Sequence, residues 1–244
     1  MRVRVLLLTL LAGLFAASVQ AEAKDCVVLL HGMARSAGSM TPLESYLKAK
    51  GYRTMSLGYA SRSSDIDKIV TEIGPVIGQF SQMCEGRLHF VTHSMGGIVT
   101  RAYLHASKPA NLGNVVMLAP PNQGSEVADF LLKNPMYVKI SGPAGQRLGA
   151  QNDAAFNQML GKVDYPLGII AGDRSVNLIS SWFLLPGADD GKVTVERARL
   201  EGMSDFIVLH TSHPTMLFSN PVKRQVGAFL KNGAFEHTDS ASAK

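Results

Sequence analysis

A serine flanked by small residues is the first sign of chemistry in this sequence. Ser94 stands in "THSMG", with Thr92 two positions before it and Gly96 two positions after it. A sharp turn from a strand into a helix needs small residues at those places, and it exposes the hydroxyl beside the first N–H of the helix. Such a serine is a nucleophile only with a base in reach and donors for the oxyanion. Ser94 is therefore a candidate nucleophile, and the alternative is a helix-capping serine beside close-packed glycines.

Donors for an oxyanion are predicted upstream, where a buried run ends in His31-Gly32. Gly32 has no side chain, so the backbone can approach the site closely there. We predict the backbone N–H groups of Met33 and Met95 as the two oxyanion donors. His31 precedes the serine at a strand end, and we expect it to orient the loop backbone rather than to act as the base.

The base is expected late in the chain if the order is serine, acid, histidine. His210 ends the run "DFIVLH", and His213 follows in the loop "TSHPTML". A base must reach over the sheet edge to the serine, and a loop position allows this more readily than a strand end. We therefore predict His213 as the base and keep His210 as the alternative. Structural or surface positions are expected for three further histidines, His89, His105 and His237.

The acid that orients the imidazole should lie on a loop between the last strands. Asp173 directly follows the run "LGIIAG". Asp190 lies further along in an Asp-Gly turn, with Asp189 as its neighbour. On the residues alone, all three aspartates remain candidates.

The elements that must position these residues follow an alternating pattern. Short apolar runs alternate with longer amphipathic ones from Cys26 onward, which predicts an α/β fold with a mostly parallel sheet flanked by helices on both faces. In the first predicted helix, Thr41 is the expected N-cap and Glu44 its capping-box partner. Residues 134–164 are predicted to form a lid-like excursion above the sheet. The predicted strands are 26–32, 52–60, 88–91, 114–120, 166–172 and 205–210, and the predicted helices are 41–51, 63–82, 96–106, 124–132 and 220–233.

The first residues have the pattern of a secretory signal peptide. Two arginines precede an apolar run from Val5 to Ala17, and small residues favour cleavage after Ala21. An uncleaved membrane anchor is the alternative, and it is disfavoured because the apolar run is short for a membrane span. We expect the protein to be secreted or periplasmic. The predicted organisation is a signal peptide at 1–21, one α/β domain at 22–235 and a flexible tail at 236–244.

The only two cysteines, Cys26 and Cys84, belong to a chain expected in an oxidising compartment. Each lies just before a β-like run, so neighbouring parallel strands would bring both sulfur atoms to the same edge of the sheet. We predict a Cys26–Cys84 disulfide, which in the chain-entropy model raises the free energy of unfolding by about 4 kcal/mol. Two unrelated buried thiols are the alternative.

Several motifs together resemble the α/β-hydrolase superfamily and, within it, the secreted bacterial lipase and esterase branch. They are "LLHGMARS", "THSMGGIV", "APPNQGSEVAD", "ADDGKVTVERARL" and "SHPTML", in the expected order over about Cys26 to Leu230. In that branch the triad acid is an aspartate in a D-G-x-V turn, which implies Asp190 here. The resemblance agrees with the choices of nucleophile, base and oxyanion donors made above. Thr92 departs from the usual glycine two positions before the serine.

These observations predict a serine hydrolase, a lipase or esterase, that cleaves carboxylic esters through an acyl-enzyme with Ser94, His213 and Asp190. No metal or organic cofactor is expected. Thioesterase, acyltransferase or amidase chemistry on the same triad is one alternative, and a non-catalytic envelope binding protein on this fold is another. The apolar residues 182–185 are expected either to line an acyl-chain site or to cover the core.

The expected partner is an acyl ester or a lipid, with transient contact with a membrane or lipid interface. Loss of the two arginines of the signal lowers the formal net charge from +5 to about +3. A chain with this charge and no basic stripe is not expected to bind nucleic acid.

Overall fold

The computed structural model describes residues 23–149, 154–175 and 187–237. The predicted signal peptide, the apolar residues 182–185 and all but the first two residues of the predicted tail lie outside these ranges. None of the described helices is both long and apolar enough to cross a membrane.

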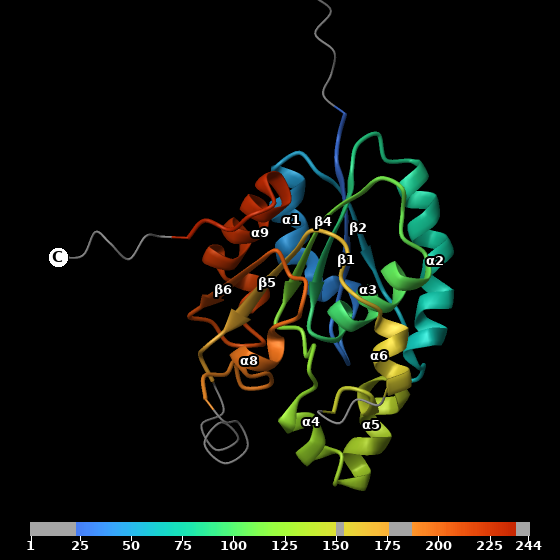
Figure 1. Ribbon diagram of the computed structural model, residues 1–244, viewed down its shortest axis with the longest axis vertical. Coiled ribbons are helices and arrows are strands. Elements are labelled where there is room, and N and C mark those ends of the chain that lie inside the picture. The colour runs from blue at the N-terminus through green and yellow to red at the C-terminus, as the bar shows by residue number, and fades with distance from the viewer. Residues whose placement is uncertain (1–22, 150–153, 176–186, 238–244) are drawn as a thin grey trace, which may run out of the picture.

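A six-stranded sheet forms the centre of the molecule, with the strand order β2-β1-β3-β4-β5-β6 (Figure 1). Every pair of neighbouring strands is parallel. The four central strands are almost wholly buried, which explains why the sequence shows continuous apolar runs there instead of alternation. The strands are β1 (Cys26–Leu30), β2 (Arg53–Leu57), β3 (Leu88–His93), β4 (Leu112–Leu118), β5 (Leu167–Gly172) and β6 (Asp205–Leu209).

Helices cover both faces of this sheet, which confirms the predicted fold class (Figure 1). On one face, α1 (Thr41–Ala49) and α9 (Asn220–Asn232) bury leucines, valines and a phenylalanine against the strands. On the other face, α2 (Ile66–Gln82), α3 (Met95–Ala106) and α6 (Ala154–Leu160) form a second apolar cluster. The sheet is therefore buried between two hydrophobic layers.

The start of α1 differs from the prediction. A short 3-10 helix, η1 (Ala37–Met40), leads directly into α1, so Met40 is the N-cap and Thr41 already has helical backbone angles. Glu44 does not form a capping box. Its carboxylate instead accepts hydrogen bonds from the hydroxyls of Thr54 (3.0 Å) and Ser56 (2.9 Å) on the edge strand β2.

Residues 134–164, for which a lid-like excursion is predicted, belong to the connection from β4 to β5. This connection carries α4 (Glu126–Leu131), α5 (Pro135–Gln146) and α6. Helix α6 packs against α3, whereas α4 and α5 extend below the rest of the fold in Figure 1. Helix α5 is kinked at Gly142, which has φ 65°. A further short helix, α8 (Val195–Ala198), and the 3-10 helix η2 (Met216–Phe218) flank β6 in the sequence.

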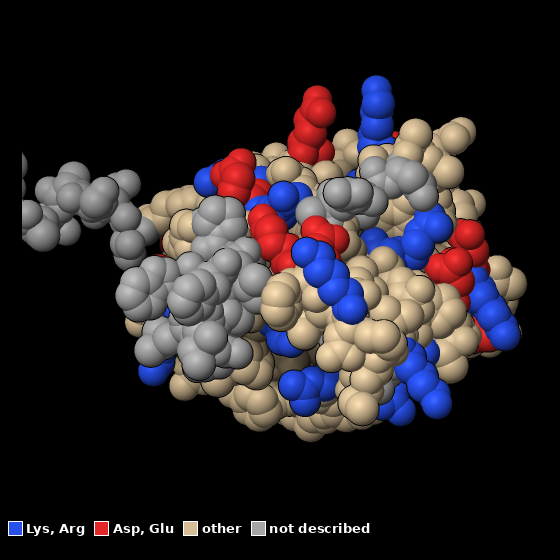
Figure 2. All heavy atoms as spheres, turned by 90° about the horizontal axis from the view of Figure 1, so that it is seen from below, with Lys and Arg blue, Asp and Glu red and all other residues tan. Residues whose placement is uncertain are grey.

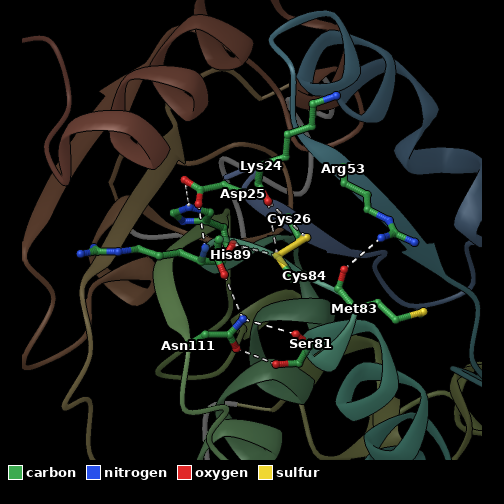
Figure 3. Close-up of a disulfide and its surroundings, with 11 residues drawn as sticks. Lys24, Asp25, Cys26, Arg53, Ser81, Met83, Cys84, His89 and Asn111 are labelled. Atoms are coloured by element: carbon green, nitrogen blue, oxygen red, sulfur yellow. Dashed lines mark hydrogen bonds and ion pairs between the residues drawn. A yellow bond between two sulfur atoms is a disulfide. The ribbon is translucent and has the colours of Figure 1, made fainter. Parts of the chain in front are cut away.

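The predicted disulfide between Cys26 and Cys84 is present (Figure 3). Cys26 is the first residue of β1, and Cys84 lies in the turn between α2 and β3, with a Cα–Cα distance of 6.0 Å. Cys26 is opposite Leu88 in the register of β1 and β3. The bond therefore fastens the amino end of the central strands.

Candidate active site

Ser94 stands on a strained turn between β3 and α3. Its φ of 55° and ψ of −125° are rare for a residue with a side chain. Its backbone N–H donates to the carbonyl oxygen of Leu118 at 2.8 Å, which ties the turn to the end of β4. A Cβ on Gly96 would lie 2.5 Å from the carbonyl oxygen of Leu30, so the residue two positions after the serine has to be glycine. These contacts are the structural reason for the motif that singled out Ser94.

Thr92 occupies the other small position of the motif and is completely buried. Its hydroxyl oxygen has no hydrogen-bond partner in the described part of the chain. The turn therefore accommodates a side chain here without clash, at the cost of one buried polar group that is unsatisfied.

His213 and Asp190 form a close pair. His213 Nδ1 lies 2.7 Å from Asp190 Oδ2, and the two side chains are 12% and 1% exposed. The other carboxylate oxygen, Oδ1, accepts hydrogen bonds from the backbone N–H groups of Lys192 (3.0 Å) and Val193 (2.9 Å). The backbone N–H of His213 also donates to the Asp190 carbonyl oxygen at 2.9 Å. The imidazole is thus held by Nδ1–H, which leaves Nε2 as a proton acceptor.

The other two candidate acids do not pair with His213. Asp173 Oδ1 lies 2.9 Å from His210 Nδ1, in a pair whose side chains are 37% and 75% exposed. Gly172 of β5 is opposite Leu209 of β6, so the residues that follow these strand ends face each other. Asp189 accepts a hydrogen bond from the backbone N–H of Gly191 within its own turn.

One glycine that the sequence analysis did not single out brings the loops of the acid and the base together. A Cβ on Gly172 would lie 2.9 Å from Asp190 Cβ and would collide with the carbonyl oxygen of Thr211. Only a glycine at the tip of β5 therefore allows the two loops to converge. The signal in the sequence was a glycine immediately before a candidate acid.

Ser94 and His213 line the same cavity, which has a volume of about 280 Å³. Its walls include loops at the carboxyl ends of β1, β3, β4 and β6, the loop that contains Asp190, and part of α4. Ligands of parallel α/β sheets bind at this edge. The apolar residues of the lining are Met33, Ala34, Pro121, Val127, Ala128, Leu148 and Val193.

The two predicted oxyanion donors flank Ser94. A Cβ on Gly32 would lie 3.1 Å from Ser94 Cβ, so the backbone just before Met33 touches the serine directly. Met95 is the first residue of α3, where the helix dipole favours negative charge. Within the described ranges, the backbone N–H groups of Met33 and Met95 donate to no other group. Both N–H groups are therefore available to an oxygen bound beside the serine.

His31 lies behind the loop with the candidate oxyanion donors, and among the described contacts it has no hydrogen bond to Ser94. Its ring is completely buried and stacks on Tyr59 with a centroid distance of 4.2 Å. Its Nδ1 lies 2.8 Å from the carbonyl oxygen of Gly32, and the Tyr59 hydroxyl donates to the His31 carbonyl oxygen. Burial lowers the pKa of His31, so the ring stays neutral and orients the loop.

His93, directly before the serine, also contributes to the site, although no motif in the sequence predicts a role for it. Its Nε2 lies 3.1 Å from the carbonyl oxygen of His213, and the two rings are 4.7 Å apart. A carbonyl oxygen can only accept, so Nε2 carries the proton. Burial, and then the nearby charge of His213, lower the pKa of His93 well below its usual value. His93 is therefore a neutral donor that holds the backbone of the candidate base.

The described residues contain no group of three or more histidine, cysteine, aspartate or glutamate side chains placed to bind a metal ion. The chemistry that this arrangement itself can perform is nucleophilic acyl transfer, because it combines a hydroxyl, an imidazole backed by a buried carboxylate, and two N–H groups that donate to no other described group.

Comparison of the fold with solved structures finds related architectures at low sequence identity. The mature lipase BlEst2 of Bacillus licheniformis is 18% identical over 87% of this chain and 93% of its own, with a TM-score of 0.74. The esterase EaEST of Exiguobacterium antarcticum is 14% identical over 86% of this chain and 93% of its own, with a TM-score of 0.61. Phospholipase PlaB of Legionella pneumophila is 17% identical over 78% of this chain and 53% of its own, with a TM-score of 0.58.

Comparison of the sequence with curated proteins finds no match. A family described as serine aminopeptidase, S33, matches residues 21–159, which is more than half of the chain and includes the turn around Ser94. With its parallel sheet and its serine turn, the chain belongs to this family and, with it, to the α/β-hydrolase superfamily.

Proposed function

We propose that this protein is a serine hydrolase that cleaves carboxylic esters through an acyl-enzyme. The observation that carries the proposal is the cavity that Ser94 shares with His213, which is paired with the buried Asp190. The names of the structural neighbours, a lipase, an esterase and a phospholipase, support ester substrates.

In the proposed mechanism, His213 Nε2 takes the hydroxyl proton as Ser94 Oγ attacks the ester carbonyl carbon. The backbone N–H groups of Met33 and Met95 donate to the oxyanion of the tetrahedral intermediate. The imidazolium then returns its proton to the leaving alcohol. In the second half of the reaction, His213 activates a water molecule that releases the acid and restores the serine. Asp190 keeps the imidazole oriented in both halves of the reaction, because its carboxylate contacts His213 Nδ1 and is itself held by two backbone N–H groups.

The charge of the cavity argues against an aminopeptidase, although the family carries that description. An aminopeptidase must bind the positively charged amino terminus of a peptide. The described cavity lining contains Arg35 and Lys192 and no carboxylate side chain. Two cations would repel an ammonium group, so an ester or another acyl compound fits this cavity better.

The apolar lining of the cavity favours the acyl chain as the part of the substrate that is bound there. We further propose that the protein works outside the cytoplasm, in the periplasm or after secretion. The disulfide at the amino end of the sheet supports this location, because structural disulfides persist in oxidising compartments.

A fluorophosphonate probe tests the proposal, since it phosphonylates activated serines. We expect labelling of the purified protein, peptide mapping of the label to Ser94, and loss of both labelling and 4-nitrophenyl ester hydrolysis in Ser94→Ala. Absence of labelling in the folded protein would support a non-catalytic binding role instead. Undiminished ester hydrolysis by Ser94→Ala would place the reaction elsewhere.

A further inference from the structure

The charged side chains described in the lining of the candidate catalytic cavity are cationic. Arg35, from the loop after β1, and Lys192, from the loop after Asp190, both line it. Both side chains are exposed, and neither forms an ion pair with a residue that the structure describes. The lining includes no described aspartate or glutamate. Within the described ranges, the cavity thus has two cations in its wall and no acidic side chain that neutralises them.

Asp190 does not compensate this charge. Its side chain is only 1% exposed and does not line the cavity, and its hydrogen bonds come from His213 and two backbone N–H groups. The Asp190 carboxylate therefore contacts the imidazole on the side that faces away from the cavity. A substrate in the cavity can contact His213, Arg35 and Lys192, which all line it.

Hydrogen bonds hold the backbone of both cationic residues close to the reacting groups. The carbonyl oxygen of Lys192 accepts a hydrogen bond from the Ser125 hydroxyl at 2.7 Å, and this serine also lines the cavity. Arg35 follows the oxyanion loop, where its backbone N–H donates to the carbonyl oxygen of Gly32 at 3.3 Å. Arg35 lines the cavity together with His93 and Ser94, the two residues at the serine turn.

We infer that the preferred substrates are esters that carry a carboxylate or phosphate group in addition to an apolar acyl chain. This inference rests on the proposed function and specifies its substrate class. The apolar part of the cavity takes the chain, and Arg35 and Lys192 take the anionic group, for which a guanidinium and an ammonium are the usual partners. Figure 2 shows the molecule from below, with several lysine and arginine side chains at the lower edge of the view that have few acidic neighbours.

Two matched pairs of esters test this inference and locate the anion. In the first pair, 4-nitrophenyl valerate is compared with 4-nitrophenyl hydrogen glutarate, which adds a carboxylate to the acyl chain. In the second pair, 1-butyrylglycerol is compared with 1-butyrylglycerol 3-phosphate, which adds a phosphate to the alcohol. We expect kcat/KM to be about tenfold higher for the anionic member of at least one pair at low salt, because two exposed cations each contribute modestly.

The preferred member identifies the side of the ester that carries the anion. The preference should shrink as sodium chloride is raised to 0.5 M, since salt screens exposed charges. Equal or better turnover of the neutral member in both pairs would overturn the inference while leaving the proposed function intact. Failure to hydrolyse any of the four esters, together with no fluorophosphonate labelling, would overturn the proposed function itself.

A charge-matched pair of variants separates a local from a general electrostatic effect. Arg35→Gln/Lys192→Gln removes the two cations at the cavity, and Arg62→Gln/Lys68→Gln removes two exposed cations that do not line it. We expect the ratio of kcat/KM for the anionic over the neutral ester to fall about tenfold in the first double variant and to stay unchanged in the second. Equal ratios in the two double variants would contradict the inference.

Discussion

Replacing Asp190 with asparagine is the sharpest test of how the candidate base is held. The carboxylate Oδ1 accepts two backbone hydrogen bonds from Lys192 and Val193, at 3.0 and 2.9 Å. In Asp190→Asn the amide oxygen must take this place, because an NH₂ group cannot accept these hydrogen bonds. The NH₂ group then faces His213 Nδ1 and donates to it. The proton of the neutral imidazole is thereby moved to Nε2, the atom that has to accept the serine proton.

The expected loss of kcat follows from the change of the His213 tautomer and from the loss of the carboxylate charge. An imidazolium and a carboxylate whose charges lie about 4 Å apart interact with about 4 kcal/mol at an effective dielectric constant of about 20. This energy corresponds to about a thousandfold in kcat. The wrong tautomer of His213 raises the expected loss to about ten-thousandfold. KM should change little, because Asp190 does not line the cavity.

The matched control is Asp173→Asn, which changes the exposed pair with His210 in the same way. Steady-state kinetics with a 4-nitrophenyl ester should give a kcat within about twofold of the parent for this control. Circular dichroism should show that both variants are folded. The reasoning would be refuted if Asp190→Asn kept more than a tenth of the parental kcat, or if Asp173→Asn abolished turnover.

Four further predictions concern single features of the structure. Thr92→Val should raise the free energy of unfolding by about 1 kcal/mol in urea titrations, because it removes a buried hydroxyl without a partner; lower stability would show that the hydroxyl is satisfied. Cys26→Ala/Cys84→Ala should lower it by about 4 kcal/mol, and a loss below 1 kcal/mol would contradict the loop-entropy argument. His93→Phe should lower kcat more than it raises KM, because the backbone of the base loses its donor; an effect on KM alone would refute this. Burial raises the Glu44 pKa, but hydrogen bonds from a lysine and two hydroxyls outweigh burial and lower this pKa. Glu44→Gln should therefore have a lower free energy of unfolding than the parent at neutral pH. This difference should disappear as the pH falls below about 4, where Glu44 is protonated.

The strands and the serine turn could be predicted because their causes are local. Strands buried on both faces require continuous apolar runs, and each of the six predicted runs overlaps an observed strand. The turn at Ser94 requires a glycine two positions later, since any side chain there would meet the end of β1. The cap of α1 was wrong by one residue because η1 runs into the helix, which a cap motif by itself does not show.

The choice of the acid depended on contacts that are not local. Asp173 follows β5 directly, and on the residues alone it was as good a candidate as Asp190. The described residues form four His–Asp pairs, and of these only the pair of His213 and Asp190 lies at the cavity with the serine. His93 went unnoticed for a similar reason, since its partner is a backbone carbonyl oxygen 120 positions later in the chain.

The disulfide lies at the amino end of β1, whereas the loop with the candidate oxyanion donors follows the carboxyl end of the same strand. A strand of this length separates the two ends by about 15 Å. Reduction of the bond therefore leaves the geometry of the serine and its partners untouched as long as the chain remains folded. In the presence of a thiol reductant, activity would then be lost at the rate at which the reduced molecules unfold. The decay of activity over time would therefore measure the kinetic stability of the reduced protein.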